Sequence, residues 1–301
     1  MESNIPDISV ISINYNGLKD TCEFLDSWIE QIHSVSYELI VVDNASKNDE
    51  AAVIEKLYPQ VQVIRSEKNL GYAGANNLGI DAAQGKYLFF LNNDVLMLDD
   101  QIPALIERLE SDKKIAGVSP LILDYEEPHA IQYAGYTPLS TITMRNRAIG
   151  EGDTNKAAYP ACETPYLHGA AMLIKRSVIN QLGKMPEEYF LYYEELDWCT
   201  YMTHEGYTLW YDPACEIIHK GSQSTGADSP LKAFYMSRNR LLYAYRNKFD
   251  FTFYLTQWYL LGVVFPVQVL RAKFHKQKDI AQAHVDGVKA FFELKRKIDR
   301  P

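Results

Sequence analysis

Strand-like and helix-like segments alternate over the first hundred residues, and this alternation constrains the fold more than any other feature. The strand-like runs are apolar and rich in β-branched residues, which is typical of buried strands. They lie at 8–13, 39–42, 61–64 and 87–91. Helix-like segments lie between them, at 18–32, 49–57 and 73–83. The order predicts an α/β fold with a mostly parallel central sheet flanked by helices, in which ligands bind beyond the carboxyl ends of the strands.

The second half of the chain has a looser pattern. After about residue 120 short strands and turns prevail, followed by an apolar strand at 170–174 and a helix at 194–203. Gly, Ser and Pro cluster at 221–230 and predict a linker. We therefore expect a main domain at 1–230, with halves at about 1–120 and about 121–230, and a helical tail at 231–301.

The main domain and the tail carry opposite charges. Residues 231–301 hold 14 Lys or Arg and 5 Asp or Glu, a net charge of +9, whereas residues 1–230 carry −18. The acidic main domain argues against nucleic acid as a partner, because such a partner requires a contiguous basic face. The tail is apolar at 253–270 and basic just after it, which favours attachment to an anionic membrane surface over a spanning helix or packing on the main domain. Because no secretory signal is visible, we expect a cytoplasmic protein, peripheral on the inner face of the cell membrane.

Polar residues follow the first two predicted strands, where a ligand is expected. Asn14, Tyr15 and Asn16 come after the first strand, and Asp43 ends the second. An aspartate at this place can accept a hydrogen bond from the imide N–H of uracil or thymine, and a tyrosine can stack on the base. The alternative is that Asp43 caps a turn or the next helix.

The fourth predicted strand is followed by Asn92, Asn93 and Asp94, and a later apolar strand ends at His219. A carboxylate at a strand end can hold a divalent cation that bridges two phosphates, since hard oxygen ligands suit Mg²⁺ or Mn²⁺. Neutral imidazole is also a ligand for manganese-type sites. An ordinary turn and a structural histidine are the alternatives.

Three carboxylates lie within four positions: Glu194, Glu195 and Asp197. On a helix Glu194 and Asp197 share a face, whereas Glu195 points elsewhere. Neighbouring carboxylates raise one another's proton affinity, which suits a general base. The alternative is a solvated acidic helix start that the helix dipole favours.

These motifs, in this order, resemble those of family 2 glycosyltransferases with the GT-A fold, above all the rhamnosyltransferase-like and galactofuranosyltransferase-like members. The resemblance covers most of residues 8–245, and it also includes Asn69, Gly71 and Asn76 and, before a later strand, Gly169 and Ala170. It implies a nucleotide-binding half at about 1–120, an acceptor half at about 121–230 and a helical, membrane-associating appendage.

The resemblance implies an inverting sugar transfer in cell-surface polysaccharide synthesis. Glu195 is the implied base, with Glu194 and Asp197 orienting it or the acceptor, and Asp94 and His219 are the implied ligands of Mn²⁺ or Mg²⁺. The implied donor is a dTDP- or UDP-sugar, with rhamnose as the first candidate, and the implied acceptor is a glycan or lipid-linked glycan. The implied donor-binding residues are Asn14, Tyr15, Asn16, Asp43, Asn69, Gly71, Asn76, Asn92, Asn93, Gly169 and Ala170.

The chain departs from the family pattern in two places. Asn92 removes a carboxylate from the metal-binding D-x-D motif, and Glu195 replaces the usual aspartate of the base motif.

Two other functions compete with sugar transfer. A sugar-phosphate nucleotidyltransferase needs a glycine-rich basic loop after the first strand, which this chain lacks. A non-catalytic glycan- or membrane-binding module is expected to have lost Glu195 or Asp94, and both are present.

Overall fold

The computed structural model describes residues 5–221, 229–248 and 250–298, so most of the predicted linker at 221–230 lies outside the described residues. The described chain divides into two compact units. Unit 1 comprises residues 5–137, 147–190 and 194–221. Unit 2 comprises residues 138–146, 191–193 and the described residues from 229 onward.

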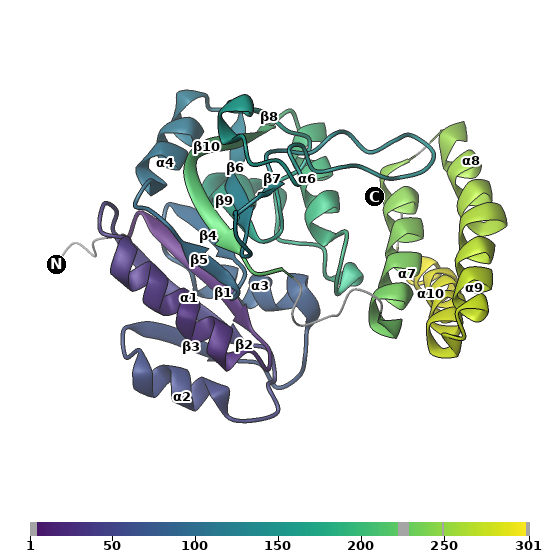
Figure 1. Cartoon of the computed structure of the whole chain (residues 1–301), viewed down its shortest axis with the longest axis horizontal. Helices are drawn as coiled ribbons and strands as arrows, with labels where there is room; N and C mark the ends of the chain where they lie inside the picture. The colour runs from purple at the N-terminus through teal and green to yellow at the C-terminus, as the bar shows by residue number, and fades with distance from the viewer. Residues whose placement is uncertain (1–4, 222–228, 249, 299–301) are drawn as a thin grey trace. The chain divides into compact units, whose positions relative to one another are not determined.

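A mixed sheet forms the core of unit 1 (Figure 1). Its strands are β1 (Ile8–Asn14), β2 (Tyr37–Asp43), β3 (Val61–Arg65), β4 (Tyr87–Leu91), β5 (Val95–Met97), β6 (Ile115–Asp124), β7 (Ile131–Tyr133), β8 (Cys162–Glu163), β9 (Ala171–Lys175) and β10 (Thr208–His219). The order across the sheet is β3-β2-β1-β4-β9-β6-β10-β5, with β7 beside β6 and β8 beside β10. β1 to β4 are parallel, whereas β9 runs antiparallel to both of its neighbours. The predicted α/β class is confirmed.

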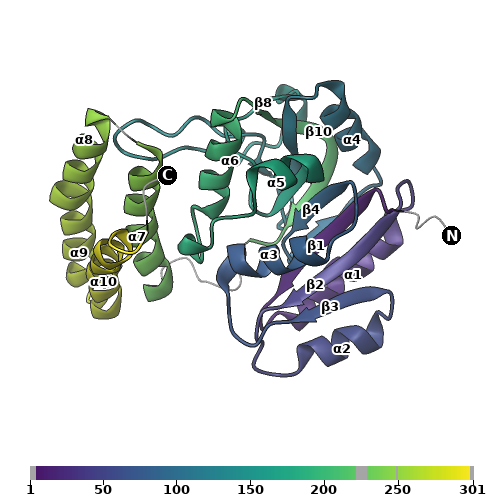
Figure 2. The same ribbon diagram turned by 180° about the vertical axis from the view of Figure 1, so that it is seen from behind.

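Helices cover both faces of this sheet. In unit 1 they are α1 (Leu18–Gln31), α2 (Glu50–Leu57), α3 (Gly71–Ala82), α4 (Ile102–Ser111), α5 (Arg176–Leu182) and α6 (Glu194–His204), with 3-10 turns η1 (Lys156–Ala158) and η2 (Glu187–Tyr189). Figure 1 shows α1 and α4 over one face, and Figure 2 shows α3 and α5 over the other. The fully buried Trp28 of α1 packs edge-on against Phe89 of β4, with ring centroids 6.2 Å apart. Such burial of large apolar side chains is the main stabilising term for this sheet.

The register of the strands determines which polar residues meet at the carboxyl edge of the sheet. Asn14 and Asp43 are direct partners at the ends of β1 and β2. His219 at the end of β10 is paired with Val95 of the antiparallel β5, directly after Asp94. His219 is also the partner of Asp124 at the end of β6. Pairing therefore brings together residues as far apart in the sequence as Val95 and His219.

Unit 2 is helical, as predicted for the tail. Its helices are α7 (Pro230–Asn247), α8 (Phe251–Tyr259), a π-helical turn η3 (Leu260–Val264), α9 (Phe265–Phe274) and α10 (Lys278–Lys295). α10 packs closely on α7 at Gly287, where an added Cβ would lie 2.3 Å from the carbonyl oxygen of Phe234. The short segments 138–146 and 191–193 join this unit through side chains of α7. Asn239 donates hydrogen bonds to the carbonyl oxygens of Leu191 (2.6 Å) and Tyr192 (2.8 Å).

Candidate active site

The loops after β1 and β2 are joined by a network of hydrogen bonds around Asp43. Asn14 Nδ2 donates to Asp43 Oδ2 (2.8 Å) and to Glu50 Oε2 (2.9 Å). The backbone N–H of Ser46 donates to Asp43 Oδ1 (3.0 Å). The turn-capping role of Asp43 is therefore present, and the side chain is almost fully buried. Recognition of a pyrimidine by Asp43 stays a prediction.

Two left-handed residues shape these loops and interlock them. Asn16 has φ 53° and Ala45 has φ 65°, a region that non-glycine residues seldom adopt. The N–H of Asn16 donates to Ser46 Oγ (2.9 Å), and Asn16 Oδ1 accepts from the N–H of Lys47 (2.8 Å). Tyr15, next to this contact, is 41% exposed, which leaves its ring accessible for stacking on a ligand.

The predicted donor residues at the start of α3 have a packing role. Asn69 Oδ1 accepts from Asn44 Nδ2 (3.1 Å) and from the N–H of Gly71 (2.8 Å). Gly71 has φ 71°, and a Cβ there would lie 2.0 Å from the carbonyl oxygen of Phe190. Glycine is thus required by the close approach of another backbone segment, whose carbonyl accepts a hydrogen bond from the N–H of Tyr72 (2.6 Å).

Other predicted donor residues are held at neighbouring places. Asn93 Nδ2 donates to Thr21 Oγ1 (2.9 Å), which ties the turn after β4 to α1. The N–H of Asn92 donates to the carbonyl oxygen of Ala170 (3.0 Å), which ties the same turn to the segment before β9. Asn76 is buried in α3. These residues therefore fix the loops around the carboxyl edge of the sheet.

Asp94 and His219, the predicted metal ligands, lie next to each other. Asp94 Oδ1 is 3.2 Å from His219 Nε2, and both side chains are buried. Asn92 Nδ2 lies 3.3 Å from the same imidazole nitrogen. On the other side of the ring, His219 Nδ1 lies 2.6 Å from Gln132 Oε1, while Gln132 Nε2 donates to Asp124 Oδ1 (3.0 Å).

This chain of contacts fixes the tautomer of His219. The Asp124 carboxylate only accepts hydrogen bonds, so the amide nitrogen of Gln132 must face Asp124 and the amide oxygen must face His219. Nδ1 of His219 then carries a proton, and the neutral ring presents the lone pair of Nε2 to Asp94. Asp94 Oδ1 is buried and accepts no hydrogen bond from the described residues. Two lone pairs thus face each other, an arrangement that fits a bound cation.

The residues at this place fit a divalent metal ion only in part. A carboxylate oxygen and an imidazole nitrogen suit Mn²⁺ or Mg²⁺. Within the described ranges, no group of three or more His, Cys, Asp or Glu side chains is placed to hold a metal ion. The small number of protein ligands agrees with the presence of Asn92 where the family pattern has a carboxylate. Asp94 and His219 would hold the ion, and ligand oxygens have to complete its coordination.

The predicted base lies at the start of α6. Glu194 and Asp197 are buried, whereas Glu195 is half-buried, in agreement with the helical spacing of the three carboxylates. A Cβ at Gly169 would lie 3.7 Å from Cγ of Glu195, so Gly169 leaves room beside the carboxylate. Burial raises the pKa of Glu195, although its own N–H and that of Leu196 lower it. The carboxylate is therefore a stronger base than an exposed glutamate.

Two tyrosines near Glu195 were missed by the sequence analysis. The hydroxyl of Tyr72 donates a hydrogen bond to the carbonyl oxygen of Gly169. The pKa of Tyr72 is raised, first by burial and then by the charges of Glu194 and Glu195. The pKa of Tyr136 is raised by burial and then by Glu195. Both hydroxyls stay protonated, so they are hydrogen-bond donors beside the predicted base.

His168, which the sequence analysis also missed, links Tyr136 to His219 of the metal pair. Its ring stacks on Tyr136, with centroids 5.9 Å apart, and meets His219 edge-on at 6.0 Å. Burial, and after it the neighbouring His219, lowers the pKa of His168 to about 3. Its Nδ1 accepts the N–H of Ala170 (3.1 Å), so the neutral ring carries its proton on Nε2. The position directly before Gly169 was the sequence signal that could have identified it.

Comparisons with known proteins agree with this architecture. A family model described as glycosyl transferase family 2 matches residues 9–183. The chain is 27% identical to the low-salt glycan biosynthesis hexosyltransferase Agl10 of Haloferax volcanii, over 80% of this chain and 76% of that protein. It is 24% identical to the dTDP-rhamnosyl transferase RfbF of Shigella flexneri, over 96% and 97% of the two chains. It is 25% identical to the N-acetylglucosaminyl-diphospho-decaprenol L-rhamnosyltransferase of Mycobacterium tuberculosis, over 63% and 68%.

Solved structures show the same fold at low sequence identity. The mannosyltransferase PcManGT from Pyrobaculum calidifontis, in complex with GDP-Man and Mn²⁺, aligns with a TM-score of 0.58 and 15% identity over 96% of this chain and 88% of that one. GalNAc-T7, solved with UDP, GalNAc and Mn²⁺, aligns with a TM-score of 0.60 and 16% identity over 89% of this chain, which spans 58% of that one. The predicted GT-A fold is confirmed by these neighbours. Because the family model covers more than half of the chain, the chain is a glycosyltransferase and belongs to glycosyl transferase family 2.

Proposed function

We propose that this glycosyltransferase moves a sugar, with rhamnose as the first candidate, from a dTDP- or UDP-linked donor to a hydroxyl of a glycan or lipid-linked glycan. One relative is named a dTDP-rhamnosyl transferase, and another is named for rhamnosyl transfer to a diphospho-decaprenol lipid. The observation that carries the proposal is the cluster at the sheet edge. In it the His168 ring stacks on Tyr136, whose pKa the Glu195 charge helps to raise, and meets the ring of His219, which lies beside Asp94.

The proposed reaction inverts the configuration at the anomeric carbon. Glu195 takes the proton of the acceptor hydroxyl, and the acceptor oxygen forms a bond to the anomeric carbon. The bond between that carbon and the diphosphate oxygen breaks on the opposite face, and its electron pair leaves with the diphosphate. Asp94 and His219 would hold the Mn²⁺ or Mg²⁺ ion, which would supply Lewis-acid stabilisation of that charge. A covalent enzyme intermediate is not required.

Unit 2 provides the proposed attachment to the cytoplasmic face of a membrane. The continuous helix Phe251–Phe274 has 24 residues and contains an 18-residue window with a mean hydropathy of 1.4, so length and composition alone allow a span. One side of it is buried within the unit through Phe253, Leu260 and Val264. Large apolar side chains are exposed elsewhere along it, namely Phe251, Tyr254, Trp258, Val263, Val267, Leu270 and Phe274. A helix that packs one side on its own protein and exposes the other suits an interfacial position.

A panel of sugar nucleotides tests the donor and the stereochemistry. The enzyme with Mn²⁺ is expected to consume dTDP-rhamnose or a UDP-sugar faster than the matched GDP-sugars, as measured by release of the nucleoside diphosphate. NMR of the glycosidic product gives the anomeric configuration. A preference for GDP-sugars would exclude the proposed donor class, and a product of retained configuration would exclude the inverting mechanism.

A further inference from the structure

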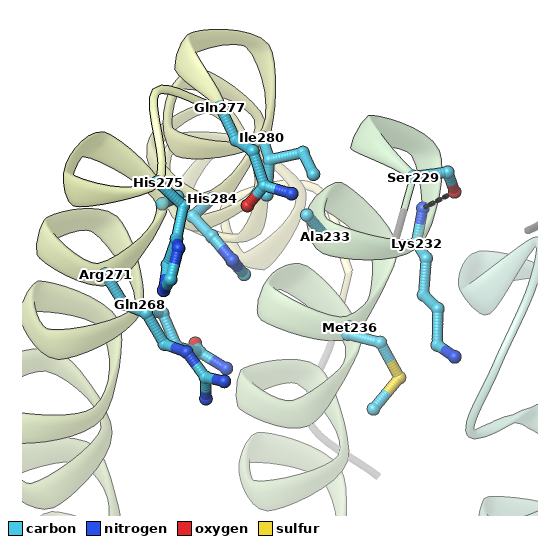
Figure 3. A pocket seen from close by; sticks show the side chains of 11 residues that line it. Ser229, Lys232, Ala233, Met236, Gln268, Arg271, His275, Gln277, Ile280 and His284 are labelled. Carbon is cyan, nitrogen blue, oxygen red and sulfur yellow. Dashed lines mark hydrogen bonds between the residues drawn. The ribbon is translucent and has the colours of Figure 1, made fainter. Parts of the chain in front are cut away.

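Unit 2 contains a cavity of about 610 Å³ between α7, α9 and α10 (Figure 3). Its size lies within the roughly 300–1,000 Å³ of small-molecule sites. The lining includes the basic or imidazole side chains of Lys232, Arg271, His275 and His284. Among the described residues no Asp or Glu is part of the lining, and Asp279 is the acidic residue in the first turn of α10. Because no residue of the candidate active site lines it, the sugar-transfer reaction does not account for this cavity.

The basic side chains of the cavity carry uncompensated charge. Figure 3 shows Arg271 and His275 projecting from the α9 end of the cavity and Lys232 projecting from α7. Among the residues that the structure describes, neither Arg271 nor Lys232 forms an ion pair. An anionic ligand would satisfy these charges.

The inner part of the cavity is polar and neutral. His284 is buried, its Nδ1 shares a hydrogen bond of 2.8 Å with Ser237 Oγ, and burial lowers its pKa. Gln277 and Ile280, at the N-terminus of α10, also line the cavity. Gln277 makes no side-chain capping bond, so the first turn of this long helix keeps N–H groups available to an anion.

The cavity adjoins the exposed apolar residues of α9. Val267, Leu270 and Phe274 are 57%, 65% and 85% exposed. Each directly precedes in the sequence a residue that lines the cavity, in the order Gln268, Arg271 and His275. Successive residues of a helix are about 100° apart around its axis, so the lining residues and the exposed apolar residues lie on adjacent faces. The cavity therefore borders an apolar stripe that consists of Val267, Leu270 and Phe274. A ligand that matches both features carries an anionic group on an apolar body.

We propose that this cavity binds the phosphate of an anionic lipid headgroup while the adjoining apolar stripe enters the membrane interface. Arg271 is the principal ligand of the phosphate, since a guanidinium binds two phosphate oxygens at once. His275, Lys232 and the N-terminus of α10 add donors. The inference rests on the proposed membrane attachment and adds a site for one chemical group, beyond the general attraction between a basic tail and an acidic surface.

Vesicles of equal surface charge but different anionic groups test the site. The full-length enzyme is titrated with phosphatidylcholine vesicles that contain either phosphatidic acid or oleate, adjusted to the same zeta potential. We expect about tenfold tighter binding to the phosphatidic acid vesicles, the gain of a charge-assisted phosphate contact over a carboxylate surface. Arg271→Gln should abolish this preference. Lys273→Gln removes the same charge from an exposed position outside the cavity, and it should weaken binding to both vesicles equally.

Each result separates the headgroup site from the membrane attachment. Equal binding of the unsubstituted enzyme to both vesicles, or equal loss of preference in the two variants, would overturn the headgroup site and leave the attachment standing. Absence of binding to either vesicle would overturn both. Inorganic phosphate alone, titrated by calorimetry, separates a lipid from a soluble anion. If it binds as tightly as the phosphatidic acid vesicles and needs Arg271, the lipid assignment is wrong.

Discussion

Asp43 and Asp94 both follow buried strands at the same edge of one sheet, but the protein surrounds them differently. Both oxygens of Asp43 accept hydrogen bonds, from Asn14 and from the N–H of Ser46. Asp94 Oδ1 is buried, accepts no hydrogen bond from the described residues and faces His219. A buried polar atom without a partner costs stability. The Asp43 carboxylate is thus hydrogen-bonded within the protein at both oxygens, whereas Asp94 Oδ1 is left open to the metal ion that we propose.

The two regions should therefore respond in opposite ways to substitution. The Asp43 network consists of Asn14, Asp43, Ser46 and Glu50, and its loss should lower the stability of the fold. The Asp94 cluster consists of Asp94, His219 and Gln132, and it extends through His168 to Glu195. Its loss should lower activity more than stability, since functional sites are not optimised for stability.

Glu195→Gln should give the largest effect. The amide keeps the shape of the side chain but accepts no proton, so turnover should fall by about 10²- to 10⁴-fold. Donor affinity and the melting temperature should stay near those of the unsubstituted enzyme. Steady-state kinetics and calorimetric donor titration measure these quantities. Nearly normal turnover would assign the base to Glu194 or Asp197.

Asp94→Ala should remove the metal dependence of donor binding. With few protein ligands, the ion binds weakly until the donor phosphates complete its coordination, so metal and donor should bind cooperatively in the unsubstituted enzyme. Loss of the Lewis acid removes several kcal/mol of transition-state stabilisation. Donor titration with and without Mn²⁺ measures the coupling. Equal affinities in both titrations, or full activity in excess chelator, would exclude a metal-dependent mechanism.

Gln132→Met should weaken Mn²⁺ binding by about 10- to 100-fold, the usual effect of removing a partner that orients a metal ligand. Methionine has a similar length but cannot accept the proton of His219 Nδ1, so the ring loses its fixed tautomer. Paramagnetic resonance of Mn²⁺ in the presence of the nucleoside diphosphate gives the affinity. Gln62→Met, on the exposed side of β3, is a control for the same change in side chain. Equal Mn²⁺ affinities in both variants would make Gln132 merely structural.

The sequence predicted the frame of the site well because that frame depends on local patterns. The buried strands β2 and β4 follow from apolar runs, and the carboxylates at their carboxyl ends, Asp43 and Asp94, follow from the rule for parallel sheets. Helical spacing alone places Glu195 on a different face of its helix from Glu194 and Asp197. Residues that are defined by pattern and chain position can thus be identified from the amino-acid sequence alone.

Residues that act through a neighbour could not be predicted. Gln132 lies in the three-residue strand β7, and its role depends on pairing with β6, beside which Asp124 and His219 end. His168 precedes a predicted motif, but its contact with His219 spans about fifty residues of chain. Gly71 stays a predicted donor residue, but the sequence did not indicate that its missing side chain makes room for the Phe190 carbonyl. Long-range packing, which leaves no periodic signal, decides all of these roles.

Asp43→Ala should lower stability as well as donor affinity. It removes the hydrogen bond from Asn14 Nδ2, which keeps Glu50 Oε2 as an acceptor, and the hydrogen bond from the backbone N–H of Ser46, which together cost about 1–3 kcal/mol. Chemical denaturation measures the loss of stability, and calorimetry measures donor binding. Asp94→Ala is the matched control and should lose less stability. A reversed order of the two stabilities would contradict the comparison, and unchanged donor affinity would refute recognition of the base by Asp43.

The smallest effect should be a dependence of stability on pH that has opposite signs at two glutamates. Burial raises the pKa of Glu195, so its stabilising contribution is complete below the unfolded pKa of about 4.3 and is lost as the pH rises through the folded value. The hydrogen bond from Arg65 lowers the pKa of the exposed Glu55, so its contribution is present above the unfolded pKa and is lost as the pH falls. Melting temperatures should therefore be measured from pH 4 to 8. As the pH rises, the melting temperature of Glu195→Gln should increase relative to that of the unsubstituted enzyme, whereas that of Glu55→Gln should decrease relative to it.

Activity should decline as the pH falls through the folded pKa of Glu195, because the base must be ionised. If the melting temperature of Glu195→Gln instead decreases relative to that of the unsubstituted enzyme as the pH rises, the carboxylate is stabilised in its ionised form. The Asp94 cluster then resembles the Asp43 network, in which the protein itself supplies the hydrogen bonds.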